Sequence, residues 1–161
     1  MKRAIFFVLA MTVGQVVNAD NVLKGRVVGV ADGDTITVLD ANRMQHRIRL
    51  SGIDAPEKKQ PFGQKSKQSL SDMVYRKEVG VLWEKKDRYG RILGKVLTPA
   101  GDVNLAQIKA GMAWHYKRYM ADQPIKDQLF YADEEVTAKR TRKGLWSDDD
   151  PTPPWEWRRR R

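Results

Sequence analysis

Hydrophobic and polar side chains alternate over residues 44–51, and this period of two is typical of a strand with one buried face. A valine-rich stretch at residues 22–31 and a short apolar stretch at residues 35–39 precede it, and both favour strand structure. Residues 32–34 and 40–43 separate the three stretches with residue types that form turns. The first part of the chain is therefore predicted to be a meander of three strands.

The remainder of the chain mixes the two periodicities. Strands are predicted at residues 79–83 and 92–97, and helices at residues 63–76, 104–110 and 122–142. The asparagine that begins the second helix is a plausible N-cap. The last helix is predicted from four apolar residues at helical spacing: Ile125, Leu129, Ala132 and Val136.

Five short strands with helices after the third and the fifth predict an α+β fold. We expect a five-stranded OB-type Greek-key β-barrel packed with three α-helices. Such barrels bind ligands at one end, where the loops between strands converge. The turn at residues 32–34, the turn at residues 54–57 and the loop at residues 89–91 are therefore expected to meet.

The two ends of the chain differ from the middle. Residues 1–19 begin with two basic residues, continue with a mostly apolar run and end in a small residue, which is typical of a secretory signal peptide. The alternative is a buried N-terminal strand or helix. We predict a signal peptide at 1–19, a functional domain at 20–146 and a poorly ordered tail rich in proline, aspartate and arginine at 147–161. The mature protein would be exported, to a periplasm or out of the cell, and would keep no membrane anchor.

Composition narrows the chemistry. The chain has no cysteine and only two histidines, His46 and His115, which excludes disulfides, a thiolate metal site and a three-histidine zinc centre within one chain. Any metal would be held mainly by oxygen, as calcium and magnesium are. The formal net charge is +10, and loss of the signal peptide lowers it by two. An anionic partner is expected, whether nucleic acid, an anionic membrane surface or another polyanion.

The end of the third strand carries the strongest candidate chemistry. Arg49 lies on the strand, and Gly52 and Pro56 then turn the chain so that Asp54 and Glu57 project from a stiff turn. A guanidinium followed closely by two carboxylates suits a site that holds a metal, a phosphate and a water together.

Two other short motifs are weak when read alone. Residues 32–35 would be an ordinary Asp-Gly turn, and residues 87–91 a solvated basic hairpin loop. Read in order with residues 49–57, however, the set resembles the staphylococcal (micrococcal) nuclease family. Residues 111–116 and 143–146 resemble later family segments, and the likeness covers roughly residues 22–147. The three motifs are Asp32-Gly33-Asp34-Thr35, Arg49 through Glu57, and Asp87-Arg88-Tyr89-Gly90-Arg91.

The resemblance implies a calcium-dependent phosphodiesterase that acts on DNA and RNA and leaves 3′-phosphates and 5′-hydroxyls. It also implies that two carboxylates and a backbone carbonyl bind calcium, that two arginines and a glutamate form a catalytic triplet, and that Asp32 acts through water next to the site. The implied calcium ligands are Asp34, Asp54 and Ala55, and the implied catalytic residues are Arg49, Glu57 and Arg91.

Substrate contacts are expected from cationic and aromatic side chains, which stack the bases of single strands. For Trp114 and Tyr116 the alternative is packing at the barrel edge. The expected substrates are single-stranded or unpaired regions of DNA and RNA, and the protein is expected to be a monomer. The candidate substrate-binding residues are Arg88, Tyr89, Trp114 and Tyr116.

Two other functions remain open at this stage. A non-catalytic nucleic-acid-binding module on the same barrel would have no need of Glu57, which is present together with both metal carboxylates. A cationic protein that binds anionic surfaces would explain the charge but not the three motifs. The nuclease interpretation therefore accounts for more of the sequence.

Overall fold

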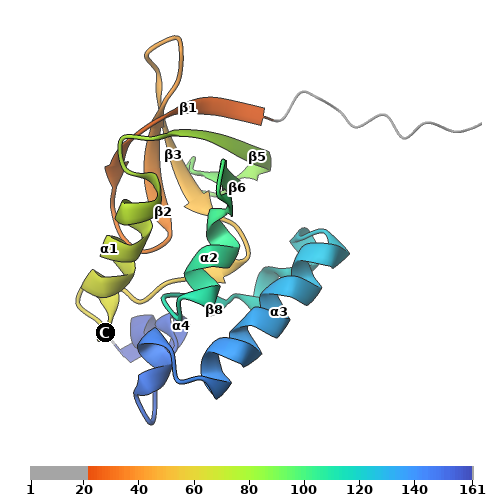
Figure 1. The fold of residues 1–161 in the computed structure, drawn as a ribbon. Coiled ribbons are helices and arrows are strands. Elements are labelled where there is room, and N and C mark those ends of the chain that lie inside the picture. The colour runs from red at the N-terminus through yellow and green to blue at the C-terminus, as the bar shows by residue number, and fades with distance from the viewer. Residues whose placement is uncertain (1–21, 161) are drawn as a thin grey trace, which may run out of the picture.

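The barrel is built from five of the strands in the structure. The computed structural model describes residues 22–160, so the predicted signal peptide at residues 1–19 lies outside the described residues. The barrel strands are β1 (Val22–Val30), β2 (Thr35–Leu39), β3 (Gln45–Leu50), β5 (Glu78–Lys86) and β6 (Ile92–Thr98) (Figure 1).

Pairing between β3 and β6 closes the sheet into a barrel. The strand order is β3-β2-β1-β5-β6, with antiparallel neighbours, and β3 also pairs with β6 in parallel. Ile48 lies opposite Ile92, and Leu50 lies opposite Gly94. The predicted α+β fold with a five-stranded OB-type barrel is therefore confirmed.

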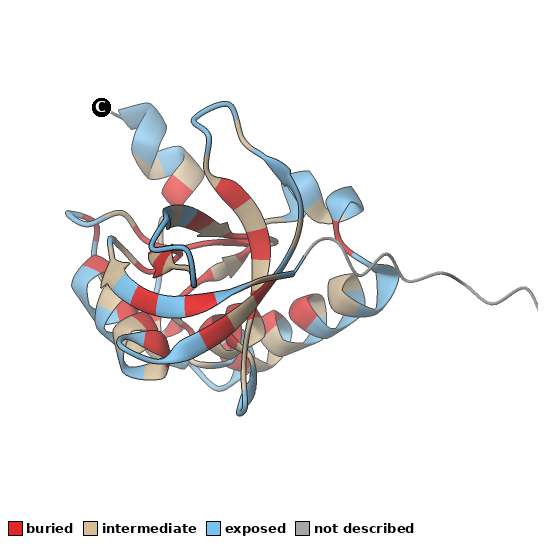
Figure 2. Ribbon diagram, turned by 90° about the horizontal axis from the view of Figure 1, so that it is seen from above, coloured by how far each residue is buried: buried red, intermediate tan, exposed pale blue. Residues whose placement is uncertain are grey.

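The alternation of hydrophobic and polar residues in the sequence corresponds to side chains that point alternately into and out of the barrel. Figure 2 shows buried and exposed residues alternating along the strands. Complete burial of one such aliphatic side chain stabilises the fold by about 1.5–3 kcal/mol. The strand residues that fill the core include Val27, Ile36, Val38, Ile48, Leu50, Val79, Val81, Ile92 and Val96.

The three predicted helices are present and lie together on one side of the barrel (Figure 1). They are α1 (Gly63–Val74), α2 (Val103–Lys109) and α3 (Ile125–Arg140), and α4 (Pro154–Trp157) is a short fourth helix near the C-terminus. Among residues 22–160, none of the helices has the length and apolar character needed to cross a membrane. Three two-residue strands complete the fold: β4 (Ile53–Asp54), β7 (Gly101–Asp102) and β8 (Trp114–His115).

The N-cap of α2 is Asp102, and the prediction of Asn104 is wrong. The Asp102 carboxylate accepts a hydrogen bond from the Leu105 backbone N–H at 3.0 Å. Asn104 is fully buried and bridges the barrel wall instead. Its Oδ1 accepts from the Val96 N–H at 3.0 Å, and its Nδ2 donates to the carbonyls of Ser51 at 2.9 Å and Gly94 at 3.1 Å.

The apolar residues that predicted α3 lie mostly on its solvent side. Ile125 is 74% exposed, Leu129 is 67% exposed and Val136 is 60% exposed. The buried residues of this helix are Tyr131, Glu135 and Ala138, and the first two carry polar tips that reach partners. Tyr131 Oη donates to Asp102 Oδ2 at 2.8 Å, and the Glu135 carboxylate accepts from the His115 backbone N–H at 3.0 Å.

Replacing Asn104 by alanine should lower the free energy of unfolding by about 2–3 kcal/mol. The Val96 N–H and two carbonyls would lose their buried partner, and each buried polar group left without one is costly. Chemical denaturation measures the change. Asn42→Ala, in an exposed turn, is the matched control and should change stability by less than about 0.5 kcal/mol; equal losses in both variants would contradict the assigned role.

Candidate active site

Three chain segments meet at one end of the barrel. The β1–β2 turn brings Asp34, the end of β3 brings Arg49, and β4 brings Asp54. Gly52 makes the turn between β3 and β4 with φ +73°, a backbone conformation that favours glycine. Strand β4 is then held by pairing with β8, where Asp54 lies opposite Trp114. The expected convergence of the 32–34 and 54–57 turns is therefore present.

Close packing holds the β1–β2 turn against its neighbours. A side chain at Gly33 would collide with Ser66 of α1, and its Cβ would lie 2.8 Å from the Ala55 Cβ. The Gln107 side chain of α2 donates to the Gly33 carbonyl at 2.7 Å and to the Ser66 carbonyl at 3.1 Å. Two helices thus fix the backbone that positions Asp34.

Arg49 lies between two buried carboxylates. Its Nη1 is 2.6 Å from Asp34 Oδ2, and its Nη2 is 2.9 Å from Asp54 Oδ1. Asp54 is 1% exposed and Asp34 is 5% exposed. Asp34 Oδ2 also accepts the Ala55 N–H at 2.7 Å. The guanidinium and its two carboxylates form a buried ion cluster that joins the three segments.

Burial sets the protonation behaviour of this cluster. It raises the pKa of Asp34 to about 7; Arg49 opposes the rise, while Asp32 and Asp54 add to it. Burial lowers the pKa of Arg49, but the neighbouring carboxylates outweigh it and the net shift is upward. Arg49 therefore stays charged. Because burial disfavours the charged form of Asp34, an additional cation beside Asp34 would stabilise that carboxylate.

Glu57 lies on the same rim, just after Pro56. Its backbone N–H donates to Gln60 Oε1 at 3.0 Å, and its carbonyl accepts from the Gln60 N–H at 2.8 Å. This tight turn leaves the carboxylate half-exposed. The structure thus brings Arg49, Asp34, Asp54 and Glu57 to one rim, as the sequence led us to expect.

An arginine from the far end of the chain also reaches this rim. Arg158 Nη2 is 2.7 Å from Asp54 Oδ2, and its Nη1 is 2.7 Å from Glu57 Oε1 and 3.3 Å from Asp54 Oδ1. The structure departs here from the expectation of a poorly ordered tail. Residues 154–157 form α4, and a 3-10 turn at Arg158–Arg160 follows. The four C-terminal arginines are conspicuous in the sequence. Nothing in the sequence near Arg158, however, indicates a contact with Asp54, which lies 104 residues earlier.

Arg91 lies in a separate set of contacts. Its Nε donates to Asp87 Oδ2 at 2.7 Å, and its backbone N–H donates to Asp87 Oδ1 at 2.9 Å. Burial raises the pKa of Asp87, but hydrogen bonds from Arg91 and Tyr89 lower it below its usual value. The Arg91 and Arg88 guanidiniums lie 5.6 Å and 4.9 Å from the centre of the Tyr89 ring. Within residues 22–160, no hydrogen bond or ion pair joins Arg91 to the carboxylates around Arg49.

Aromatic side chains line a cleft of about 420 Å³ beside the rim. Trp114 contacts Trp146 edge-on, with ring centres 4.2 Å apart. Tyr116 stacks on Trp155 of α4, with ring centres 5.5 Å apart and planes 14° from parallel. Trp114 therefore takes part in packing, and Tyr116 presents its face to another ring. The cleft is lined by Trp114, His115, Tyr116, Lys117, Arg118, Glu135, Lys139, Trp155 and Arg159.

The donor set around Asp34 suits a hard cation. Its side-chain donors are the carboxylate oxygens of Asp34 and Asp54, and oxygen is the ligand atom that calcium prefers. Within the described part of the chain, no cluster holds three or more histidine, cysteine, aspartate or glutamate side chains in metal-binding positions. A cation here would therefore rely on Asp34, Asp54 and main-chain oxygen, completed by water.

The protein is thus a small OB-type barrel that carries a buried ion cluster at one rim and an aromatic cleft beside it. The model of the staphylococcal nuclease homologue family matches residues 47–148. An uncharacterized endonuclease of Escherichia coli is 46% identical over 162 residues, which span all of both chains. An uncharacterized endonuclease of Haemophilus influenzae is 48% identical over 83% of this chain and 72% of its own. A micrococcal nuclease of Shigella flexneri is 43% identical over 84% of this chain and 80% of its own.

The chain belongs to the staphylococcal nuclease family. It is by homology a nuclease, a hydrolase of phosphodiester bonds. The resemblance inferred from the three short motifs is therefore confirmed.

Replacing Gly33 by alanine should lower the free energy of unfolding by about 1–3 kcal/mol, because the added methyl group has no room between Ser66 and Ala55. Urea denaturation measures the change. Gly80→Ala is the matched control, since a Cβ there meets open space, and it should shift stability by less than about 0.5 kcal/mol. A Gly33 variant as stable as the Gly80 variant would show that the turn is not held by this packing.

Proposed function

We propose that the chain is an exported, calcium-dependent nuclease that cleaves DNA and RNA to 3′-phosphate and 5′-hydroxyl ends. The observation that supports this most is Arg49, held by Asp34 and Asp54 at the loop end of the barrel with Glu57 on the same rim. A purely structural ion pair would not need a further carboxylate half-exposed beside it. The family relationship supports the same reaction class.

Calcium would be held by the Asp34 and Asp54 carboxylates and the Ala55 backbone carbonyl. When bound, it would neutralise phosphate charge and lower the pKa of a bound water. Calcium does this less strongly than zinc, so a protein base remains useful. Members of this family typically use Ca²⁺.

Glu57 is the proposed base. Its half-exposed carboxylate can accept a proton from a water that attacks the phosphorus in line with the 5′ oxygen. The P–O5′ bond then breaks, the phosphate stays on the 3′ side, and the leaving 5′ oxygen takes a proton from solvent water to become the 5′-hydroxyl. Water activation and metal binding are thereby divided between Glu57 and the two buried aspartates.

The arginines would stabilise charge as it grows on the phosphate. Arg49 is fixed on β3 by its two carboxylates, so its position costs little reorganisation during the reaction. In our proposal Arg91 moves from Asp87 to the phosphate and stabilises the leaving 5′ oxygen. Its loop carries Arg88 and the exposed Tyr89, which suit contacts to the nucleic-acid strand.

The aromatic cleft supports single-stranded or unpaired substrate. Tyr116 offers a ring face for base stacking, and Lys117, Arg118 and Lys139 line the same cleft. Stacking on such surfaces tolerates every base, while cations follow the backbone. Duplex bases already stacked on each other would gain less from it.

Cleavage of a single-stranded oligonucleotide by the mature protein should require calcium and stop on addition of a chelator. Products analysed by mass spectrometry should carry 3′-phosphates and 5′-hydroxyls. Heat-denatured protein and magnesium in place of calcium are the controls. Binding without cleavage in calcium would instead favour a non-catalytic nucleic-acid-binding module.

Arg91→Ala should lower turnover at least about 100-fold, as removal of one preorganised donor to the transition state does. The domain should stay folded, because the backbone N–H groups of Tyr89 and residue 91 still hold the loop to Asp87. Initial rates at saturating calcium measure the effect. Arg47→Ala, an exposed arginine on β3, is the control; a near-normal rate for the Arg91 variant would remove Arg91 from the mechanism.

A further inference from the structure

The C-terminal segment contacts both halves of the proposed site at once. Arg158 bonds the carboxylates of Asp54 and Glu57, the first a proposed calcium ligand and the second the proposed base. Three residues earlier, Trp155 stacks on Tyr116, the proposed base-stacking platform. Helix α4 and the 3-10 turn that follows it therefore cover the cation side and the nucleotide side of the proposed site.

At Asp54, the Arg158 guanidinium occupies the position that the proposed calcium ion would need. Both carboxylate oxygens lie within hydrogen-bond distance of the Arg158 guanidinium, at 2.7 Å and 3.3 Å. Asp54 is 1% exposed, so it has few alternative partners. A carboxylate closed by a guanidinium fork cannot offer the same lone pairs to a cation.

The Trp155 ring stacks on Tyr116 as a nucleobase would on the proposed platform. It lies nearly parallel to the Tyr116 ring and also contacts Trp114 edge-on, with ring centres 5.6 Å apart. Trp155 and Arg159 line the cleft together with Lys117 and Lys139. A base that stacked on this face of Tyr116 would need the position that Trp155 holds.

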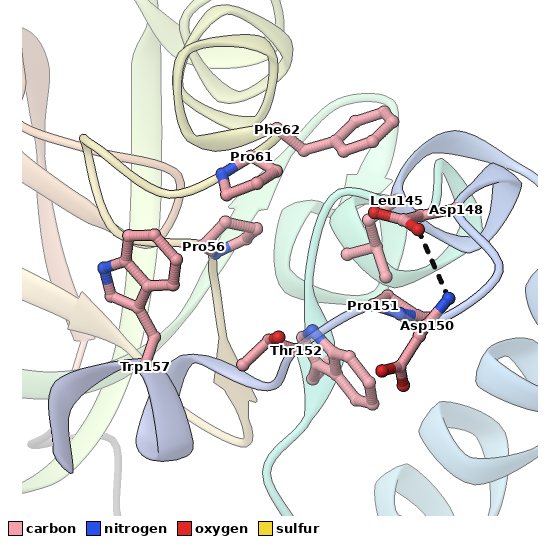
Figure 3. Close-up of a pocket in the computed structure, with 10 residues that line it drawn as sticks. Pro56, Pro61, Phe62, Leu145, Asp148, Asp150, Pro151, Thr152 and Trp157 are labelled. Atoms are coloured by element: carbon pink, nitrogen blue, oxygen red, sulfur yellow. Dashed lines mark hydrogen bonds between the residues drawn. The ribbon is translucent and has the colours of Figure 1, made fainter. Parts of the chain in front are cut away.

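The segment is anchored just before these contacts. The Gln60 side chain, in the turn after Glu57, donates to the Thr152 carbonyl at 2.6 Å. Figure 3 shows Trp157 beside Pro56 and Pro61, with Pro151 and Thr152 across the same small pocket. Arg158 itself is 41% exposed, so water can reach its head group and release is feasible.

We propose that residues 151–160 act as an intramolecular competitor of both calcium and nucleic acid, with Arg158 on the cation carboxylates and Trp155 on the stacking platform. The proposal rests on the proposed function, because it takes the same residues as ligands. Calcium binding displaces Arg158 from Asp54, and nucleic acid displaces Trp155 from Tyr116. The resting protein thus needs a higher concentration of either ligand than the same site would without its tail.

Arg158→Ala should bind calcium about three- to tenfold more tightly than the unaltered mature chain, as expected for loss of a partly exposed bidentate ion pair. Isothermal titration calorimetry without substrate measures this directly. Arg160→Ala removes the same charge from the same exposed segment and should leave calcium affinity unchanged. Unchanged or weaker calcium binding by the Arg158 variant, with a normal circular dichroism spectrum, would overturn the proposal, and so would equal gains in both variants.

Trp155→Ala tests the nucleotide side independently. In a chelator, where the proposed nuclease cannot turn over, it should bind a fluorescein-labelled oligothymidylate more tightly by fluorescence anisotropy. Weaker binding would mean that Trp155 is part of the substrate platform and not a competitor. Because the calorimetric readout involves no cleavage, failure of the nuclease proposal and failure of the competition proposal are distinguishable.

Movement of the segment can be observed because the chain has no cysteine. A nitroxide attached at Arg160→Cys should give narrower spectral lines when calcium is added, since Arg158 would leave Asp54. A calcium-saturated protein whose lines stay as broad as before would contradict displacement.

Discussion

The structure of the site depends on Arg49 being held between Asp34 and Asp54. Two carboxylates that are both almost fully buried repel each other, and each loses its hydration; a buried cation between them is the condition for their coexistence. The same ion cluster ties together the β1–β2 turn, the end of β3 and the short strand β4. The same contacts therefore balance the buried charges and fix the local backbone.

Barrel closure makes that constraint rigid. Arg49 lies opposite Thr35 on one side of β3 and opposite Leu93 on the other, so both edges of its strand are bonded. Asn104 reinforces the closure from α2 by bonding β6 and the turn after β3. An arginine held this way keeps its position when a neighbouring carboxylate changes partner, as the proposed exchange of Arg158 for calcium requires.

Features that follow from the local pattern of hydrophobic and polar residues could be predicted from the sequence. Features that depend on long-range tertiary packing could not. The barrel strands follow from alternation, and the meeting of Asp34 with Asp54 follows from barrel geometry. The exposed face of α3 could not be predicted, because Tyr131 and Glu135 are buried through polar partners that a hydrophobic count does not register. Arg158 could not be placed either, since a disordered tail and a tail folded onto the rim have the same composition.

The distribution of charge joins these observations. The chain carries a net charge of +10, which attracts a polyanion, yet its proposed catalytic rim concentrates carboxylates to hold a cation. Without that cation the rim has more negative charge than Arg49 alone can balance. Burial raises the pKa of Asp34 most, and the neighbouring Asp32 and Asp54 carboxylates add to the rise. Arg158 supplies a second positive charge from within the chain. A cation that replaced it would relieve the same electrostatic imbalance. The released Arg158 guanidinium would then lie beside the proposed phosphate site, where it could contact the substrate.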